Sequence, residues 1–181
     1  MDSLDIRKIR RLVERFRTAM DELQEKGLFD KENPFRSFPR GCCGDTSYLL
    51  AEYLRKKGID TIYVWGNDYD QSHAWLVVKN EFVKKPSEQV IALPNNITSV
   101  YNSYSSGINN ETIDVTCYKE NDLINGLIID ITGDQFGENP IYIGYMDDFH
   151  KKYEFGGAHD FERLSDARLY RIYRMIIQHI S

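Results

Sequence analysis

Three short segments of the chain hold residues whose types and order suggest chemistry. A cysteine, a histidine and an aspartate can act together as nucleophile, general base and orienting carboxylate once folding brings them close in space. We predict such a set, in which the cysteine attacks a substrate, the histidine takes the thiol proton and the aspartate holds the histidine ring. The three residues are Cys43, His73 and Asp130.

Each of these residues is expected on an element that suits its role. Cys43 stands at the start of an apolar helical pattern, and the free amides and positive dipole end of a helix N-terminus stabilise a thiolate. His73 is expected to begin a strand, where the backbone would hold its ring, and Asp130 follows apolar strand residues. Each signal alone is more typical of a structural residue. All three together, in this order, favour catalysis.

The segment that starts at Cys43 resembles the nucleophile segment of transglutaminase-like proteins, which belong to the wider papain-like group of cysteine enzymes. The segment 72–75 resembles the His-Ala-Trp strand of that family, and the segment 130–132 resembles its Asp-Pro-Thr motif with isoleucine in place of proline. The resemblance covers residues 41–136, with an interruption. Its helix positions are Cys43, Ser47, Leu49, Leu50, Leu54, Gly58 and Ile59.

This resemblance implies acyl transfer on an amide, such as a peptide bond or a glutamine side chain, through a thioester and without a cofactor. It selects Cys43 over Cys42 as the nucleophile, because Gly-x-Cys and the spacing to Gly58 then fall into register. The backbone amide of Cys43 would be one oxyanion donor. Papain-like enzymes often carry a second donor on an upstream glutamine, and no glutamine lies between Leu28 and Cys42. Site walls are expected from Cys42, Gly44, Trp75, Trp65 and Tyr48.

Three alternatives remain open at this point. The chain would also fit a catalytically silent transglutaminase-like module that binds a protein. Asp134 is a second candidate for the orienting carboxylate, although its expected loop position makes it a poorer anchor for the ring. A Tyr- and Asn-rich insertion at residues 80–124 could dock a partner protein.

The surrounding pattern predicts an α+β fold with a papain-like or transglutaminase-like core. In that core the nucleophile helix packs on a mainly antiparallel sheet between N- and C-terminal helices. An apolar stripe predicts a helix over residues 2–27, and a second helix runs from Gly41 to Gly58. The C-terminal helix should be capped by Ser165. The segment 28–41 should be an extended loop. Strands are expected at residues 59–65, 74–78, 127–131 and 141–145, with short strands at 90–93 and 112–118 inside the insertion.

Composition limits the function classes. The formal net charge of -5 argues against broad nucleic-acid binding. A membrane span needs about 20 apolar residues, and the sequence has no such run. The first residues also lack the apolar core of a signal peptide. We therefore expect a single catalytic domain, residues 1–181, in the cytoplasm, with a protein or peptide substrate and no nucleic-acid or membrane partner.

Two smaller expectations concern cysteines and metals. Three cysteines in a chain without an evident leader indicate free thiols, and Cys117 is expected to be a semi-buried structural thiol. Four residues near the C-terminus lack regular metal-ligand spacing and are expected to be surface residues, so no metal is predicted. They are Asp147, Asp148, His150 and His159.

Overall fold

The structure, a computed structural model, describes residues 6–79, 87–90 and 114–180. Its centre is a five-stranded sheet in the order β6-β5-β2-β1-β7, in which all neighbouring strands are antiparallel. The predicted α+β class with a mainly antiparallel sheet is therefore confirmed. The strands are β1 (Thr61–Asp68), β2 (Gln71–Val78), β5 (Leu127–Asp130), β6 (Tyr142–Gly144) and β7 (Glu154–Asp160).

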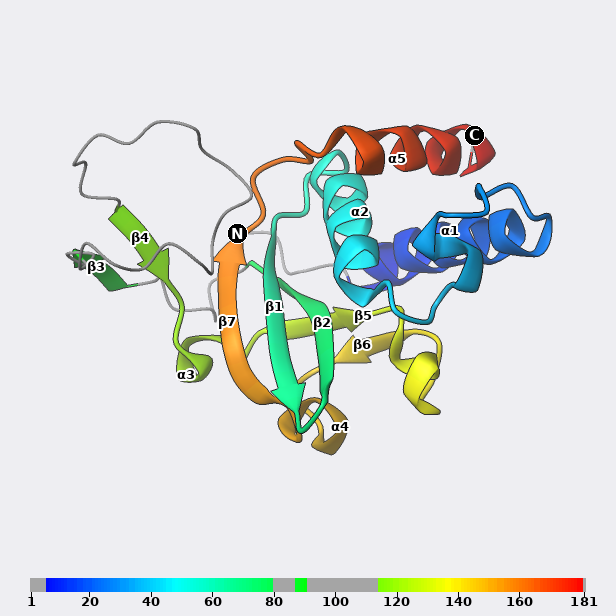
Figure 1. Ribbon diagram of the computed structural model, residues 1–181. Coiled ribbons are helices and arrows are strands. Elements are labelled where there is room, and N and C mark those ends of the chain that lie inside the picture. The colour runs from blue at the N-terminus through cyan, green and yellow to red at the C-terminus, as the bar shows by residue number, and fades with distance from the viewer. Residues whose placement is uncertain (1–5, 80–86, 91–113, 181) are drawn as a thin grey trace, which may run out of the picture.

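Three long helices lie to one side of the sheet (Figure 1). They are α1 (Ile6–Glu25), α2 (Cys43–Arg55) and α5 (Ala167–Ile180). The helix α2 packs against β1 and β2 and also contacts the other two helices, so it is the central element of this layer. Its predicted apolar side is buried as expected: Leu49, Leu50, Ala51, Tyr53 and Leu54.

The ends of these helices follow from local chemistry. After α1 the backbone turns at Gly27, whose φ is 64°, and after α2 it turns at Gly58, whose φ is 79°. Both values lie in the left-handed region that glycine adopts without strain. The predicted cap of α5 was wrong by one residue. The Asp166 carboxylate, not Ser165, accepts the hydrogen bond from the Leu169 amide at 2.9 Å.

Alternate residues of the strands supply two cores, one on each face of the sheet. Leu76 and Val78 join the core beneath the helices, whereas Trp75 and Val77 join a second core on the opposite face. The strand β2 begins at Gln71, earlier than predicted, so His73 is its third residue rather than its first. By alternation His73 belongs to the same face as Trp75.

The edge strand β7, which pairs with β1, was not predicted from the sequence. Two adjacent glycines, Gly156 and Gly157, concealed it because glycine disfavours strands. The packing explains them. A Cβ atom added at Gly156 would lie 2.1 Å from the ring of Trp65, so this indole covers the strand only because the side chain is absent.

The shorter elements complete the described chain. The predicted loop 28–41 contains a 3-10 helix, Pro34–Ser37, and the predicted strand at 112–118 is shortened to β4 (Asp114–Cys117). It pairs with β3 (Ser87–Val90). Residues 80–86 and 91–113 of the insertion lie outside the described residues, as do most of the predicted strand 90–93 and the Cys117 side chain. The remaining elements are α3 (Glu120–Leu123), a 3-10 helix at Gly133–Phe136 and α4 (Asp148–Lys151).

Within the described ranges, none of the helices combines the length and the apolar character that crossing a bilayer requires.

Candidate active site

The two adjacent cysteines at the start of α2 have different environments. Cys42 is 3% exposed, and its thiol donates to the carbonyl oxygen of Pro39 at 3.3 Å. Burial raises the pKa of Cys42 to about 12, which keeps this thiol protonated. Cys43 is the first residue of the helix and is partly exposed.

The environment of Cys43 favours its thiolate. Burial by itself raises the pKa of this thiol, but interaction with the His73 ring and with the backbone amides of Ala74 and Gly44 brings the pKa below its ordinary value. The thiolate is the reactive form of cysteine. The two adjacent thiols therefore differ, since the pKa of Cys43 lies below its ordinary value and that of Cys42 lies above it.

His73 is 1% exposed and lies between the thiol and a carboxylate. Its Nε2 atom lies 2.8 Å from Oδ2 of Asp130. The Nδ1 atom makes no regular hydrogen bond within the described part of the chain, so Nδ1 is the nitrogen left to exchange a proton with Cys43. Burial lowers the pKa of His73, but Asp130 and Cys43 outweigh that effect and raise it to about 9. The ring therefore favours its charged form beside a thiolate.

Asp130 ends β5 and is 2% exposed. Its Oδ1 atom accepts hydrogen bonds from the amide of Thr132 at 2.8 Å and from the Thr132 hydroxyl at 3.1 Å. Asp134, the alternative orienting carboxylate, instead binds the guanidinium of Arg17 at 2.7 Å. The structure thus brings Asp130, and not Asp134, to His73.

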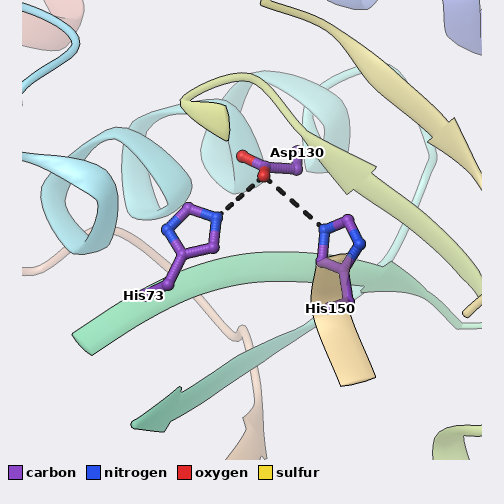
Figure 2. Close-up of side chains that lie close together, drawn as sticks. All are labelled: His73, Asp130 and His150. Atoms are coloured by element: carbon purple, nitrogen blue, oxygen red, sulfur yellow. Dashed lines mark hydrogen bonds and ion pairs between the residues drawn. The ribbon is translucent and has the colours of Figure 1, made fainter. Parts of the chain in front are cut away.

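A second buried histidine contacts Asp130 from the other side, and the sequence analysis missed it. His150 of α4 is 1% exposed, and its Nε2 atom lies 3.6 Å from Oδ2 of Asp130 (Figure 2). Its Nδ1 atom lies 2.5 Å from Oδ1 of Asp147. The expectation of a surface position was therefore wrong for His150, although Asp148 and His159 are exposed. The only sequence signal was the spacing of three between Asp147 and His150, which places both on one helical turn.

These groups also resemble a metal site. Among the described residues, His73, Asp130 and His150 each offer a ligand atom, and these atoms lie within 4.8 Å of one another. However, both histidines point a ring nitrogen at the same carboxylate oxygen, and the 2.8 Å contact of His73 is a direct hydrogen bond. An ion would have to replace that bond. The direct bond between His73 and Asp130 therefore favours a carboxylate–imidazole pair over a cation site, and Nε2 of His150 makes no hydrogen bond within the described residues.

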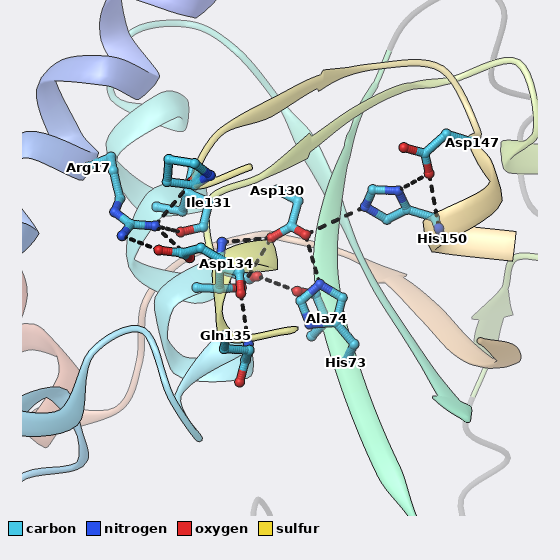
Figure 3. A network of polar contacts seen from close by, with 12 residues as sticks. Arg17, His73, Ala74, Asp130, Ile131, Asp134, Gln135, Asp147 and His150 are labelled. Carbon is cyan, nitrogen blue, oxygen red and sulfur yellow. Dashed lines mark hydrogen bonds and ion pairs between the residues drawn. The ribbon is translucent and has the colours of Figure 1, made fainter. Parts of the chain in front are cut away.

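Two further residues, also missed from the sequence, hold the segments that carry Cys43 and Asp130. The Gln135 side chain accepts from the amide of Gly41 at 3.2 Å and donates to the carbonyl of Thr132 at 3.0 Å, which ties the two segments together. The buried guanidinium of Arg17 donates to the carbonyls of Ile131 and Pro140 as well as to Asp134 (Figure 3). The sequence did not indicate either role, because each of these side chains hydrogen-bonds to a residue more than 90 positions away.

The residues predicted to form the site walls lie in different places, and of the two tryptophans only Trp75 lies beside His73. Trp75 is buried, and its ring centroid lies 5.7 Å from that of His73. Trp65 instead covers Gly156 of β7, as described above. Gly44 faces the hydroxyl of Tyr63, whose ring stacks on Tyr48 at 4.6 Å.

A hollow of about 430 Å³ opens beside the first turns of α2, and Asp45 and Tyr48 form part of its lining. The loop 161–166 between β7 and α5 supplies most of the remainder, together with the end of β7 and Leu169 of α5. Neither Cys43 nor His73 is among its lining residues.

The sequence matches no protein-family model, and comparisons with curated proteins and with solved structures find no match either.

Proposed function

We propose that this protein is a cysteine-dependent hydrolase or acyltransferase that acts on an amide, either a peptide bond or a glutamine side chain, through a thioester intermediate. One observation carries the proposal: the His73 ring is hydrogen-bonded to the Asp130 carboxylate and also interacts with the Cys43 thiol. The lowered pKa of Cys43 and the raised pKa of His73 support it, because together they favour a thiolate beside an imidazolium.

The reaction would proceed in two steps. In the first, the Cys43 sulfur adds to the amide carbonyl carbon, and the carbon–nitrogen bond breaks as the His73 imidazolium gives its Nδ1 proton to the leaving amine. A thioester remains on the enzyme. In the second, neutral His73 takes a proton from water or from an incoming amine, which attacks the thioester. The carbon–sulfur bond then breaks, and the thiolate and imidazolium return.

The start of α2 supplies the electrostatic support for these steps. The helix is 13 residues long, and its first-turn amides point toward the space before Cys43. We assign the backbone amide of Cys43 as a donor to the oxyanion that forms when the carbonyl is attacked. Asp130 keeps the imidazole oriented during both steps without itself taking a proton.

The test is the rate of iodoacetamide labelling as a function of pH, read by peptide mass spectrometry. Cys42→Ser is the background, because Cys43 is then the only thiol in its peptide. We expect an apparent pKa of Cys43 well below the ordinary value of about 8.5. We also expect His73→Ala to slow labelling near neutral pH. If Cys43 titrates as an ordinary thiol, the catalytic proposal fails and a silent protein-binding module is the better description.

Acyl-enzyme trapping then separates the chemistries. Mass spectrometry of the intact protein mixed with a glutamine peptide should show a thioester adduct, with release of ammonia for a side-chain amide or of a shorter peptide for a backbone amide. Adding a primary amine distinguishes transfer from hydrolysis, because only transfer places that amine in the product.

A further inference from the structure

The carboxylate of Asp130 is surrounded more completely than a single histidine partner requires. Its Oδ1 atom has two donors from Thr132, and both histidines approach its Oδ2 atom. A buried carboxylate is costly unless donors replace the water it has lost. Each donor therefore helps to keep Asp130 ionised inside the protein.

We propose that His150, held by Asp147, is a positioning residue that keeps Asp130 ionised and turned toward His73. This role presupposes the thiol chemistry proposed above, because its purpose is to orient the base of that reaction. His150 and His73 approach the Oδ2 atom of Asp130 from different directions (Figure 2).

Asp147 fixes the orientation of the His150 ring. Its Oδ1 atom lies 2.5 Å from Nδ1 of His150 and also accepts the backbone amide of the same residue at 3.0 Å, as the N-cap of α4. With Nδ1 directed at Asp147, the ring can present only Nε2 to Asp130. Aromatic rings pack around it with centroids at 5.0 to 5.1 Å, from Trp75, Tyr142 and Phe149.

The result is an alternating chain of carboxylates and imidazoles: Asp147, His150, Asp130, His73 (Figure 3). Burial raises the pKa of Asp130, but the nearby His150 ring and the hydrogen bonds from His73 and Thr132 hold it well below its usual range. Without His150, the Oδ2 atom would lose one of its two partners. The carboxylate would then be less strongly ionised and freer to rotate away from His73.

The experiment compares three substitutions in the Cys42→Ser background. His150→Phe keeps a planar ring but removes the donor. His150→Gln restores a donor near the position of Nε2, and His179→Gln is a matched control, since His179 pairs with Glu22 at 2.6 Å on another part of the molecule. Circular dichroism and urea unfolding establish that each variant is folded.

For His150→Phe we expect Cys43 labelling near neutral pH to slow about tenfold, equivalent to a rise of about one unit in its apparent pKa. His150→Gln should recover most of the rate, and His179→Gln should label like the parent. Equal labelling of the parent and His150→Phe, in a protein where His73→Ala slows the reaction, would overturn the role. So would stoichiometric zinc in the purified parent that is lost in His150→Phe, because His150 would then be a ligand.

A second readout does not depend on thiol reactivity. In Cys43→Ser protein, the His73 Nε2 proton that is hydrogen-bonded to Asp130 should give a low-field NMR resonance. Adding His150→Phe should shift or broaden this resonance, and His150→Gln should restore it. An unchanged resonance rejects the role of His150 even if Cys43 proves to be reactive. A changed resonance with an ordinary Cys43 thiol rejects the proposed function alone and leaves His150 as an orienting group for His73.

Discussion

The Nε2 atom of His73 lies 2.8 Å from Oδ2 of Asp130, although the two residues are 57 positions apart in the sequence. They reach each other because β2 and β5 are adjacent antiparallel strands, with Leu76 opposite Ile129. Continued by one residue, that register sets Trp75 opposite Asp130, so His73, two residues before Trp75 on the same face of β2, lies diagonally across from Asp130. The pairing of β2 with β5 therefore brings the His73 ring and the Asp130 carboxylate together.

The two neighbouring thiols should behave differently. We expect Cys43→Ser to abolish rapid iodoacetamide labelling at neutral pH, and Cys42→Ser to leave it unchanged, because only Cys43 interacts with His73 and burial raises the pKa of Cys42 to about 12. Labelling rates of the two single variants check this. Rapid labelling that survives in Cys43→Ser would mean that the reactive thiol has been misassigned.

The raised pKa of His73 makes a prediction about stability. Its value of about 9 in the folded protein exceeds the ordinary 6.5, so protonated His73 stabilises the fold fully below about pH 6.5, and this contribution disappears as the pH rises through about 9. The difference in unfolding free energy between wild type and His73→Gln should therefore shrink over that interval, as measured by urea denaturation.

The matched control for this measurement is Asp130→Asn, which removes the carboxylate that raises the pKa of His73. In that background, the change in unfolding free energy caused by His73→Gln should vary much less with pH. In the wild-type background, a change that grows from pH 6.5 to pH 9 would contradict the assignment.

Gln135 should affect both the site and stability. In Gln135→Leu, the Gly41 amide loses its acceptor and the Thr132 carbonyl loses its donor, so we expect a stability loss of about 1 kcal/mol and slower labelling of Cys43. Gln135→Glu retains an acceptor for Gly41 and should keep more of the labelling rate. If the two variants label equally slowly, the hydrogen bond to Gly41 is not what holds the Cys43 segment.

The glycine beneath Trp65 provides a test of the β7 edge. Gly156→Ala should destabilise the protein by about 2 kcal/mol, because the new methyl group would overlap the indole and the strand would have to shift. Trp65→Ala removes the obstacle, so the double variant should lose less stability than the two single losses added together. Strict additivity of the two changes would show that the packing is not the cause.

The elements predicted well were helices that bury one face, because the spacing of apolar residues within the helix itself marks that face. The stripe through Ile9, Val13 and Phe16 specified α1, and the cluster Leu49, Leu50 and Leu54 specified α2, because helical spacing alone places these residues on one face. Even there, the stripe extended too far, since Ile6 is 42% exposed.

The features that were missed depend on contacts made across the fold. The burial of His150 comes from the packing of α4 against Trp75. A helix of four residues is too short for its sequence pattern to predict which side is buried. The strand β7 was not predicted because its glycines are required by the packing of an indole from β1, which the local sequence does not indicate. The chemical types at Cys43, His73 and Asp130 were visible in the sequence. Their support from His150 and Gln135 was not, because polar residues at irregular spacing carry no periodic signal.

The Arg17 guanidinium has a consequence for the order of folding. It joins α1 to carbonyls 114 and 123 residues away, at Ile131 and Pro140. Contacts of such long sequence separation form late, because the chain entropy of closing the loop must be overcome first. The Asp130 segment should therefore become ordered only when the N-terminal helix docks. The candidate site should then be among the last regions of the protein to fold.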